Sequence, residues 1–344
     1  MPAWVIPAFL AGVAVSLLAS SRLVRALESV GEHFGLPELL LGLVVAIAAD
    51  TPELTSAITA LVQGQRSVGV GVLLGSNVFN IAALLGLGSL VAGRVPIHRR
   101  VVAVEAVTAI GVAGPATAFV GHGLGALPAS LIILAFFGPY LALSIVPPAR
   151  LPLPPGACRW LALAVTEEAA EMAAGLGAVR PEPGPGGLTI APPPLRRPAI
   201  EAGGALVLVV AASALMEHAA SSGGASLGLP QLVTGGLVLA AVTSLPNAVA
   251  AVYLARRGRG AALMAEAMNS NSINIVGGLA VPALFGGLTL ARPGPGAWLT
   301  AGTYAGMTLL ALALALGGRG FGRRSGAALV GVYVTFATAL VLVG

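Results

Sequence analysis

Apolar stretches of about 20 residues recur along the chain, separated by short segments rich in arginine, glycine or proline. A helix of about 20 apolar residues crosses the roughly 30 Å hydrocarbon core of a bilayer. The pattern therefore predicts an all-α polytopic membrane protein with ten transmembrane helices. The predicted spans are residues 2–20, 38–63, 67–92, 100–120, 125–147, 199–221, 230–256, 260–286, 298–317 and 326–343.

The distribution of arginine predicts the orientation of these spans. All 18 basic residues are arginine, and 16 of them fall on alternate connections. Cytoplasmic connections carry the excess of positive charge. Both termini are therefore expected outside. The first apolar run is expected to be a retained helix, because Arg22 and Arg25 follow it, whereas a signal peptide carries its positive charge before the apolar core.

A proline-rich segment divides the chain into two halves. Residues 148–198 contain PPARLPLPP, PEPGPGG and APPPLRRP, with one short helical candidate at 159–176. We interpret this segment as a cytoplasmic linker. It separates an N-terminal five-helix repeat, residues 1–147, from a C-terminal five-helix repeat, residues 199–344. Three glutamates of the linker could bind a regulatory cation or form a solvated helix face: Glu167, Glu168 and Glu171.

The two halves share a repeated pattern of polar residues. At an offset of 194, residues 42–85 align with 236–279 without a gap, and 12 of the 44 positions are identical. The identities include Pro52 with Pro246, and the asparagines 77 and 80 with 271 and 274. The copies occupy spans two and three and spans seven and eight. Because five spans separate them, they run in opposite directions, which is typical of transporters with inverted repeats and interrupted helices.

The two aligned prolines predict interrupted helices at the same depth in each repeat. Proline has no N–H and clashes with the carbonyl four residues earlier. Pro52 therefore frees the carbonyl of Ala48, and Pro246 frees that of Val242. Unpaired carbonyls at membrane depth are tolerated only inside protein or beside a water-filled cavity. They are also suitable ligands for hard cations.

Acidic and amide side chains surround these prolines. Asp50 and Glu53 share a helix face, and Glu266 lies in the second repeat. A carboxylate at the bilayer centre costs at least about 2.5–3.5 kcal/mol, and adjacent carboxylates repel unless a cation or proton lies between them. Oxygen ligands suit calcium and sodium. The predicted metal ligands are Asp50, Glu53, Asn77, Thr243, Ser244, Asn247, Glu266 and Asn271, with the carbonyls of Ala48 and Val242.

A further group of polar residues is assigned to the site or to helix packing. About half of the neutral candidates are expected to make interhelical hydrogen bonds instead of binding cation. Interhelical hydrogen bonding is the stronger alternative for Ser76, Ser270 and Asn80. The additional candidates are Thr51, Ser76, Asn80, Ser270 and Asn274. Outside this group, Glu105 is expected in an interfacial ion pair with Arg99 or Arg100, and Glu217 with His218 in a vestibule or at the interface.

Composition narrows the function classes. The chain is 57% hydrophobic and 9% charged. Its arginines lie in loops and form no patch for nucleic acid. The single cysteine, Cys158, excludes a disulfide framework, and neither histidine nor cysteine joins the polar set, which argues against zinc or copper. A membrane hydrolase lacks support because no HExxH or GxGD motif occurs. We predict a non-enzyme with no permanently bound cofactor, whose partners are the lipid bilayer and inorganic cations.

The polar motifs resemble those of the cation/calcium exchanger superfamily, which includes the sodium/calcium exchangers. That family carries Gly-Thr-Ser-Leu-Pro-Glu followed by Gly-(Asn/Asp)-x-x-Gly-Ser-Asn-x-Phe-Asn in each repeat. Here Gly75–Asn80 keeps the second motif, and Thr243–Pro246 and Asn269–Asn274 keep parts of both in the second repeat. The resemblance implies ten helices in two inverted repeats and a secondary antiporter that exchanges Ca²⁺ for Na⁺ or H⁺, in a divergent prokaryotic plasma-membrane member.

The departures from the family pattern fall within the site. Asp50 stands where the family has serine, and Asn247 where it has its second glutamate. Val72 replaces an amide and Glu266 an aspartate or asparagine, which weakens the case for sodium coupling. By resemblance, Asp50 and Glu53 would hold the divalent ion and Glu266 would serve a coupling ion. Exchange of Na⁺ for H⁺, exchange of another divalent cation, and a non-transporting cation-binding relative remain open as alternatives.

Overall fold

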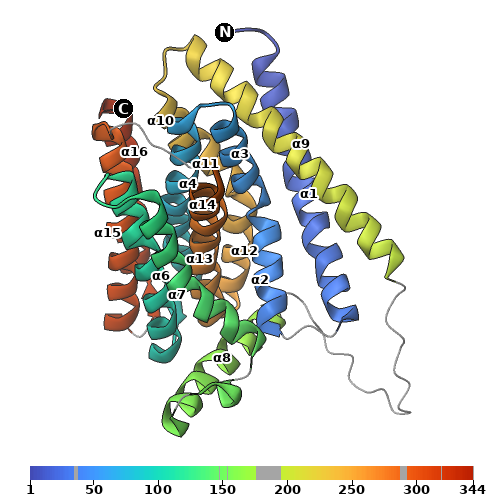
Figure 1. The fold of residues 1–344 in the computed structure, drawn as a ribbon, viewed down its shortest axis with the longest axis vertical. Helices are drawn as coiled ribbons and strands as arrows, with labels where there is room; N and C mark the ends of the chain where they lie inside the picture. The colour runs from blue at the N-terminus through green and yellow to red at the C-terminus, as the bar shows by residue number, and fades with distance from the viewer. Residues whose placement is uncertain are drawn as a thin grey trace.

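The computed structural model describes residues 1–34, 38–146, 148–152, 154–175, 195–286, 293–318 and 320–343, and these residues form a helical bundle (Figure 1). Helices α1 (Val5–His33) and α9 (Arg196–Ser226) lie side by side along one flank. A Cβ atom on Gly12 would lie 2.6 Å from the Met216 side chain. The two long helices therefore cross closely, and the small residue permits it.

Seven helices of the described residues are long and apolar enough to cross a membrane. Each has a mean hydropathy of at least 1.6 over its most apolar window. One of these spans, Arg66–Ala92, is continuous through three segments: α4 (Arg66–Asn80), the π-helical η1 (Ile81–Leu87) and α5 (Gly88–Ala92). The others are α1, α9, α6 (Arg99–Val120), α7 (Ala126–Ile145), α15 (Pro295–Gly318) and α16 (Arg323–Val343).

The remaining predicted spans are built from shorter pieces. The second consists of α2 (Glu38–Ala49) and α3 (Thr51–Val62). The seventh consists of α10 (Gln231–Val233), η3 (Thr234–Leu239), α11 (Ala240–Thr243) and α12 (Leu245–Arg256). The eighth consists of α13 (Gly260–Ile275), η4 (Val276–Ala280) and α14 (Val281–Gly286). Helical structure thus occurs in each predicted span. The spans that are divided into short segments are those that carry the polar residues.

The interrupted helices pack at the centre of the bundle through glycine. Helix α4 crosses η3 so closely that a Cβ atom on Gly75 would lie 2.3 Å from the carbonyl oxygen of Gly236. A Cβ on Gly71 would lie 3.0 Å from the Gly236 nitrogen. Small residues four apart allow two backbones to approach in this way. The α4–η3 crossing fixes the first repeat against the second where the polar residues lie.

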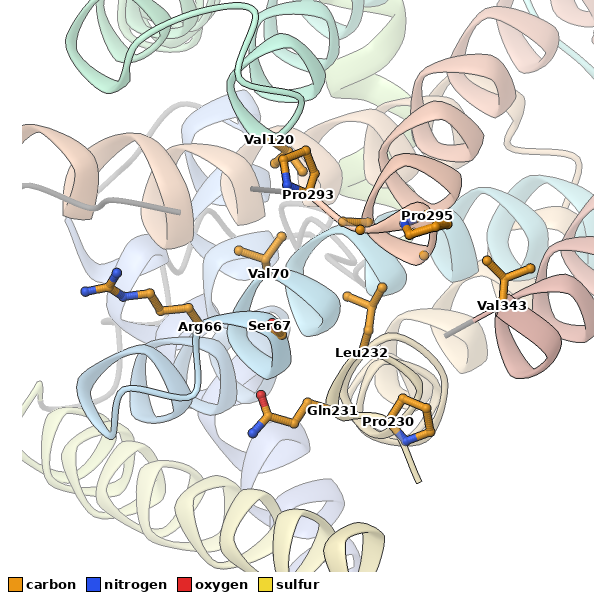
Figure 2. A pocket seen from close by; sticks show the side chains of 13 residues that line it. Arg66, Ser67, Val70, Val120, Pro230, Gln231, Leu232, Pro293, Pro295 and Val343 are labelled. Carbon is orange, nitrogen blue, oxygen red and sulfur yellow. The ribbon is translucent and has the colours of Figure 1, made fainter. Parts of the chain in front are cut away.

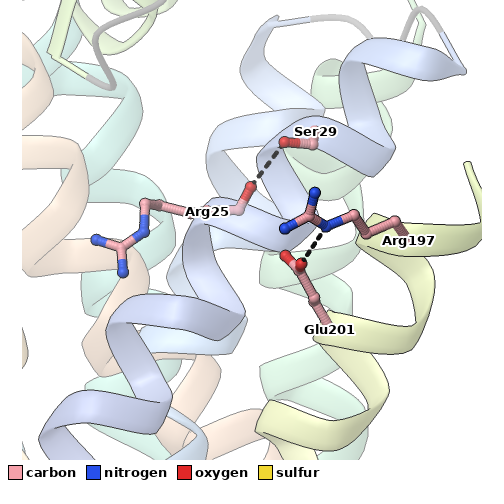
Figure 3. Close-up of polar contacts among 4 residues, drawn as sticks. All are labelled: Arg25, Ser29, Arg197 and Glu201. Carbon is pink, nitrogen blue, oxygen red and sulfur yellow. Dashed lines mark hydrogen bonds and ion pairs between the residues drawn. The ribbon is translucent and has the colours of Figure 1, made fainter. Parts of the chain in front are cut away.

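The two ends of the bundle differ. Both chain termini lie at one end, which we call the terminal end, and α8 (Pro155–Gly175) lies at the opposite end, the linker end (Figure 1). Near the linker end, Arg197 donates to Glu201 at 2.9 Å on α9, beside Arg25 and Ser29 of α1 (Figure 3). A short antiparallel pair, β1 (Arg94–Pro96) with β2 (Gly320–Gly322), joins the two halves of the chain.

The proline-rich segment is more structured than a simple tether over its first part. Residues 148–150 form η2, and α8 packs against α2, α6 and α13. Helix α8 overlaps the helical candidate expected at 159–176. The side chains of the three linker glutamates lie outside the described residues.

Candidate cation site

The two helix breaks are one residue wide and have nearly the same backbone. Asp50 separates α2 from α3 with φ −82° and ψ −4°, and Ser244 separates α11 from α12 with φ −85° and ψ 2°. In each case proline is the second residue of the following helix, where its missing N–H costs little. Asp50 N–H donates to the Ala46 carbonyl at 2.9 Å and Ser244 N–H to the Ala240 carbonyl at 3.2 Å, so each break is a short interruption of the helix.

The first break presents two fully buried carboxylates to neutral residues of the second repeat. The Ser244 hydroxyl donates to Glu53 Oε1 at 2.9 Å. The Asn247 amide donates to Asp50 Oδ1 at 2.7 Å and lies 3.5 Å from Glu53 Oε1. Ser270 of α13 also donates to Asp50 Oδ1, at 2.6 Å. Three neutral donors of one repeat therefore surround the acidic pair of the other.

The second oxygen of each carboxylate lacks a donor. Asp50 Oδ2, Glu53 Oε2 and Asn247 Oδ1 are buried and accept no hydrogen bond within the part of the chain that the structure describes. Two charges 5 Å apart at an effective dielectric of about 20 repel by roughly 3 kcal/mol. Buried acceptors without donors and a like-charged pair both favour a cation or a proton at this place. The oxygen-only donor set fits a hard cation.

Four asparagines join the two repeats through reciprocal hydrogen bonds. Asn77 donates to the Asn271 carbonyl at 3.1 Å, and Asn271 donates to the Asn77 carbonyl at 3.2 Å. Asn80 donates to Ser270 Oγ at 2.9 Å, and Asn274 lies 3.5 Å from Ser76 Oγ. Shifting each residue by 194 positions converts each of these contacts into its counterpart in the other repeat. These side chains therefore make interhelical hydrogen bonds, while Asn80 Oδ1 and Asn274 Oδ1 are buried without a donor among the described residues, so a ligand role for them stays a prediction.

Four other predicted ligands are placed near the breaks without a described contact to the carboxylates. The Thr51 hydroxyl donates to the Ile47 carbonyl at 3.0 Å, and that of Thr243 donates to the Leu239 carbonyl at 2.9 Å. Each hydroxyl thus bonds a carbonyl of the preceding turn, Ile47 in α2 and Leu239 in η3. The carbonyls of Ala48 and Val242 are those left without an N–H by the prolines.

Glu266 lies apart from the acidic pair. It is half-buried on α13, one turn before Ser270, and interacts with Asp50 through charge. Its carboxylate makes no hydrogen bond in the described ranges. Among the described residues, no three His, Cys, Asp or Glu side chains are grouped to hold one metal ion. The three predicted carboxylates therefore divide into a pair and a single group.

Several polar contacts near the site were absent from the sequence interpretation. Tyr140 of α7 accepts a hydrogen bond from Asn269 at 2.7 Å, and the side chain of Tyr304 of α15 is buried near Asn77. The chain has only four tyrosines, so a lone tyrosine within an apolar span was the available signal. Glu105, expected at the interface, is instead completely buried, because α6 packs against α13 and α15.

A separate cavity of about 400 Å³ lies near the beginning of α4, α10 and α15 (Figure 2). Arg66, Ser67 and Gln231 supply its polar side chains, and valine, leucine and proline supply most of the remainder. It contains no carboxylate and none of the predicted ligands. The candidate cation site between the two breaks is therefore separate from this cavity.

Comparison with known proteins identifies relatives over most of the chain. A family model described as sodium/calcium exchanger protein matches residues 4–146 and 199–342. The inner membrane protein YrbG of Escherichia coli (strain K12) is 38% identical over 81 residues, which are 23% of this chain and 25% of that protein. The alignments with curated relatives span no more than 29% of their length.

Two groups of solved structures share the fold. The sodium-calcium exchanger NCX_Mj, soaked with Na⁺ and Sr²⁺, has a TM-score of 0.61 at 21% identity, covering 98% of this chain and 99% of that one. The H⁺/Ca²⁺ exchanger CAX has a TM-score of 0.69 at 14% identity, covering 98% of this chain and 86% of that one. The same architecture thus occurs in proteins described with different counter-ions.

Proposed function

This chain belongs to the sodium/calcium exchanger protein family, and we propose that it is a secondary antiporter that exchanges Ca²⁺, or a similar hard cation, for Na⁺ or H⁺. The observation that carries the proposal is the buried pair Asp50 and Glu53, each with one oxygen that lacks a donor, at a helix break facing a second break. Structural relatives described as Na⁺/Ca²⁺ and H⁺/Ca²⁺ exchangers support the same substrate class.

We assign the divalent cation to Asp50 and Glu53. Their two negative charges match a divalent ion, which removes both the mutual repulsion and the cost of burying charge. Asn247 would contribute its unpartnered Oδ1, and the carbonyls of Ala48 and Val242 are further candidate ligands. Ser244 and Ser270 orient the two carboxylates by hydrogen bonds of 2.9 and 2.6 Å.

We assign the coupling ion to the neighbourhood of Glu266. Its single carboxylate matches one monovalent cation or one proton, and its charge interaction with Asp50 links its occupancy to that of the pair. After Ca²⁺ leaves, the carboxylates must bind Na⁺ or H⁺ before the protein can pass through a closed conformation. The reason is that uncompensated charges are costly in an apolar environment. This requirement couples the two fluxes.

The proposed topology has ten transmembrane helices in two inverted five-helix repeats. The terminal end would face outside and the linker end the cytoplasm, in agreement with the arginine distribution. Alternating access would occur by movement of α1 and α9 against the core of interrupted helices. Their separate flank position and the paired breaks support this mechanism (Figure 1).

Two alternatives are distinguished by flux and binding. Exchange of Na⁺ for H⁺, or of another divalent cation, is favoured by the relocated carboxylate, since Asn247 leaves the second break neutral. A cation-binding relative without transport would show binding and no flux. The proposed antiporter is neither an enzyme nor dependent on a permanently bound cofactor.

The test is Ca²⁺ uptake by purified protein in sealed vesicles, under an imposed Na⁺ gradient and separately under an imposed pH gradient. We expect uptake under at least one gradient, and its loss in Asp50→Asn and Glu53→Gln. Glu201→Gln is the matched control, because Glu201 is an exposed surface carboxylate paired with Arg197. Absence of uptake under both gradients would overturn the Ca²⁺ assignment, and uptake that survives both site variants would overturn the assignment of the ligands.

A further inference from the structure

A second buried carboxylate lies between α3 and α9, outside the site assigned above. Glu217 of α9 is 0% exposed, and its Oε1 accepts a hydrogen bond from Ser221 at 2.9 Å. Its Oε2 is buried without a partner among the described residues. A carboxylate inside a membrane helix is expensive and usually functional. The sequence placed Glu217 only in a vestibule or at the interface, so its burial requires another explanation.

Polar side chains surround Glu217 on both helices. Ser213, Glu217 and Ser221 are spaced by four residues and share one face of α9. Ser213 is also 0% exposed, and its Oγ has no described partner. From α3, Ser56 donates to the Ser213 carbonyl at 3.5 Å, and Gln63, which follows α3, lies near Glu217 and accepts a hydrogen bond from the Gln65 side chain at 3.1 Å.

These contacts form a file of oxygen atoms that leads to the cation site. Glu53, Ser56 and Gln63 lie on one face of α3, and α3 packs against α9 (Figure 1). Ten residues of helix between Glu53 and Gln63 correspond to about 15 Å. The file therefore begins at the acidic pair and ends where α3 ends, at the terminal end of the bundle.

The equivalent position at the linker end is apolar. The segments Gly35–Leu39 and Gly228–Leu232, which follow α1 and α9, match at an offset of 193. At this offset Ser213 corresponds to Ser20, whose buried hydroxyl also lacks a described partner. Glu217 corresponds to Val24. The carboxylate is thus specific to the terminal end, and the packing of the repeat alone does not account for it.

The charge balance of this cluster fits a monovalent cation. Glu217 supplies one negative charge, and Ser213 and Ser221 supply neutral hydroxyl oxygens. The next residue, His218, is exposed, and its ring stacks on Trp4 with centroids 5.5 Å apart. A divalent ion would leave an uncompensated charge among apolar helices, which is costly.

We propose that Glu217, with Ser213, binds Na⁺ between the terminal-end surface and the acidic pair. This site extends the proposed function, because it assigns Na⁺ as the ion that enters along α3 and α9. It holds Na⁺ one step before the central cluster, and its occupancy does not require Ca²⁺. It is therefore testable by binding, without measuring transport.

Trp4 provides the probe. In full-length protein carrying Trp160→Phe and Trp298→Phe, Trp4 is the only tryptophan. Fluorescence is titrated with NaCl against choline chloride at constant ionic strength, without Ca²⁺. We expect a saturable change whose half-saturation concentration rises at least tenfold in Glu217→Gln. Glutamine keeps the shape of the side chain and can bond Ser221. Glu201→Gln, an exposed carboxylate on the same helix, is expected to leave the titration unchanged.

Three results would overturn the proposal: no saturable Na⁺ response, an unchanged response in a folded Glu217→Gln protein, or a response to acid that Na⁺ does not produce. Thermal melting of both glutamine variants establishes that they are folded. Failure of the proposed antiport is recognised separately, as absence of Ca²⁺ flux in the wild-type protein. The Na⁺ titration and the flux measurement therefore fail independently.

Discussion

The helix break in the first half and the break in the second half share a backbone and differ in charge. Asp50 and Ser244 occupy the same place with φ values of −82° and −85°. The first break carries two carboxylates, whereas the second carries a serine and an asparagine that donate to them. A duplicated scaffold thus fixes the geometry, and single side chains decide where the charge lies.

The four asparagines that join the repeats, which we call the asparagine layer, are equivalent in the two halves: Asn77, Asn80, Asn271 and Asn274. Asn77 and Asn271 exchange equivalent bonds of 3.1 and 3.2 Å, so the two repeats remain alike where they hold each other. Ser270 departs from this equivalence because it donates to Asp50, whereas Ser76 donates to the carbonyl of Leu73. The two halves are alike in the asparagine contacts between them and differ in the side chains of the proposed cation site. The predictions below separate these two roles.

The largest effect on Ca²⁺ binding is expected from the carboxylates of the first break. Glu53→Gln removes one of two charges from a buried site, a change of about 3–5 kcal/mol, and should weaken Ca²⁺ binding by roughly 100-fold or more. Asn247→Ala removes a neutral ligand and should weaken it by about tenfold. Equilibrium ⁴⁵Ca²⁺ binding to purified protein measures both. Equal losses in the two variants would contradict the unequal roles of the breaks.

The hydrogen bond between the breaks is expected to contribute next. Ser244→Ala removes the donor to Glu53, a bond to a charged group worth about 1.5–3 kcal/mol, so Ca²⁺ affinity should fall by roughly tenfold or more. Thr335→Val is the control, because that hydroxyl donates to the Gly331 carbonyl on the exposed face of α16. The same binding assay applies, and an effect below twofold in Ser244→Ala would show that Glu53 does not need this donor.

The scaffold is expected to depend on the glycine crossing. Gly75→Ala places a Cβ atom against the backbone of Gly236, and overpacking of this kind costs about 1–3 kcal/mol. Thermal unfolding in detergent should show a lower midpoint. Gly138→Ala is the control, since a Cβ there meets nothing within 4 Å. Matching midpoints for the two variants would mean that the α4–η3 crossing can open without cost.

The smallest effects should come from the symmetric layer. Asn77→Ala and Asn271→Ala each remove one of two reciprocal bonds, worth about 0.6–1.7 kcal/mol in a membrane protein. Unfolding without Ca²⁺ should therefore give similar losses for both. A large difference between them would indicate that the layer is not symmetric in energy.

The sequence predicted helical structure in each apolar stretch, and the two breaks, because these signals are local. Apolar length, proline and the polar repeat place each interrupted helix, and the aligned asparagines indicate where the repeats meet. The direction of each hydrogen bond was not predictable, since it depends on which rotamer packs across the interface. Thr243 and Thr51 were candidate ligands by composition, yet helical hydroxyls often bond the preceding turn, as both do here.

Burial of isolated charged residues was predicted least well. Glu105 and Glu217 were expected near an interface because each lies close to a span end or to charged neighbours in sequence. Both are completely buried, since α6 packs between α13 and α15 and α9 packs against α1 and α3. Tertiary packing determines the burial of these two side chains, and no local sequence pattern indicates it.

The most direct test of the account moves the charge from one break to the other. Ca²⁺ uptake is measured for Asp50→Ser alone and for Asp50→Ser combined with Asn247→Glu. If the breaks are equivalent in geometry and the charge alone is relocated, uptake is lost in the single variant and recovered in the double variant. Wild-type uptake in Asp50→Ser alone would contradict the central claim, because transport would then not depend on the acidic pair.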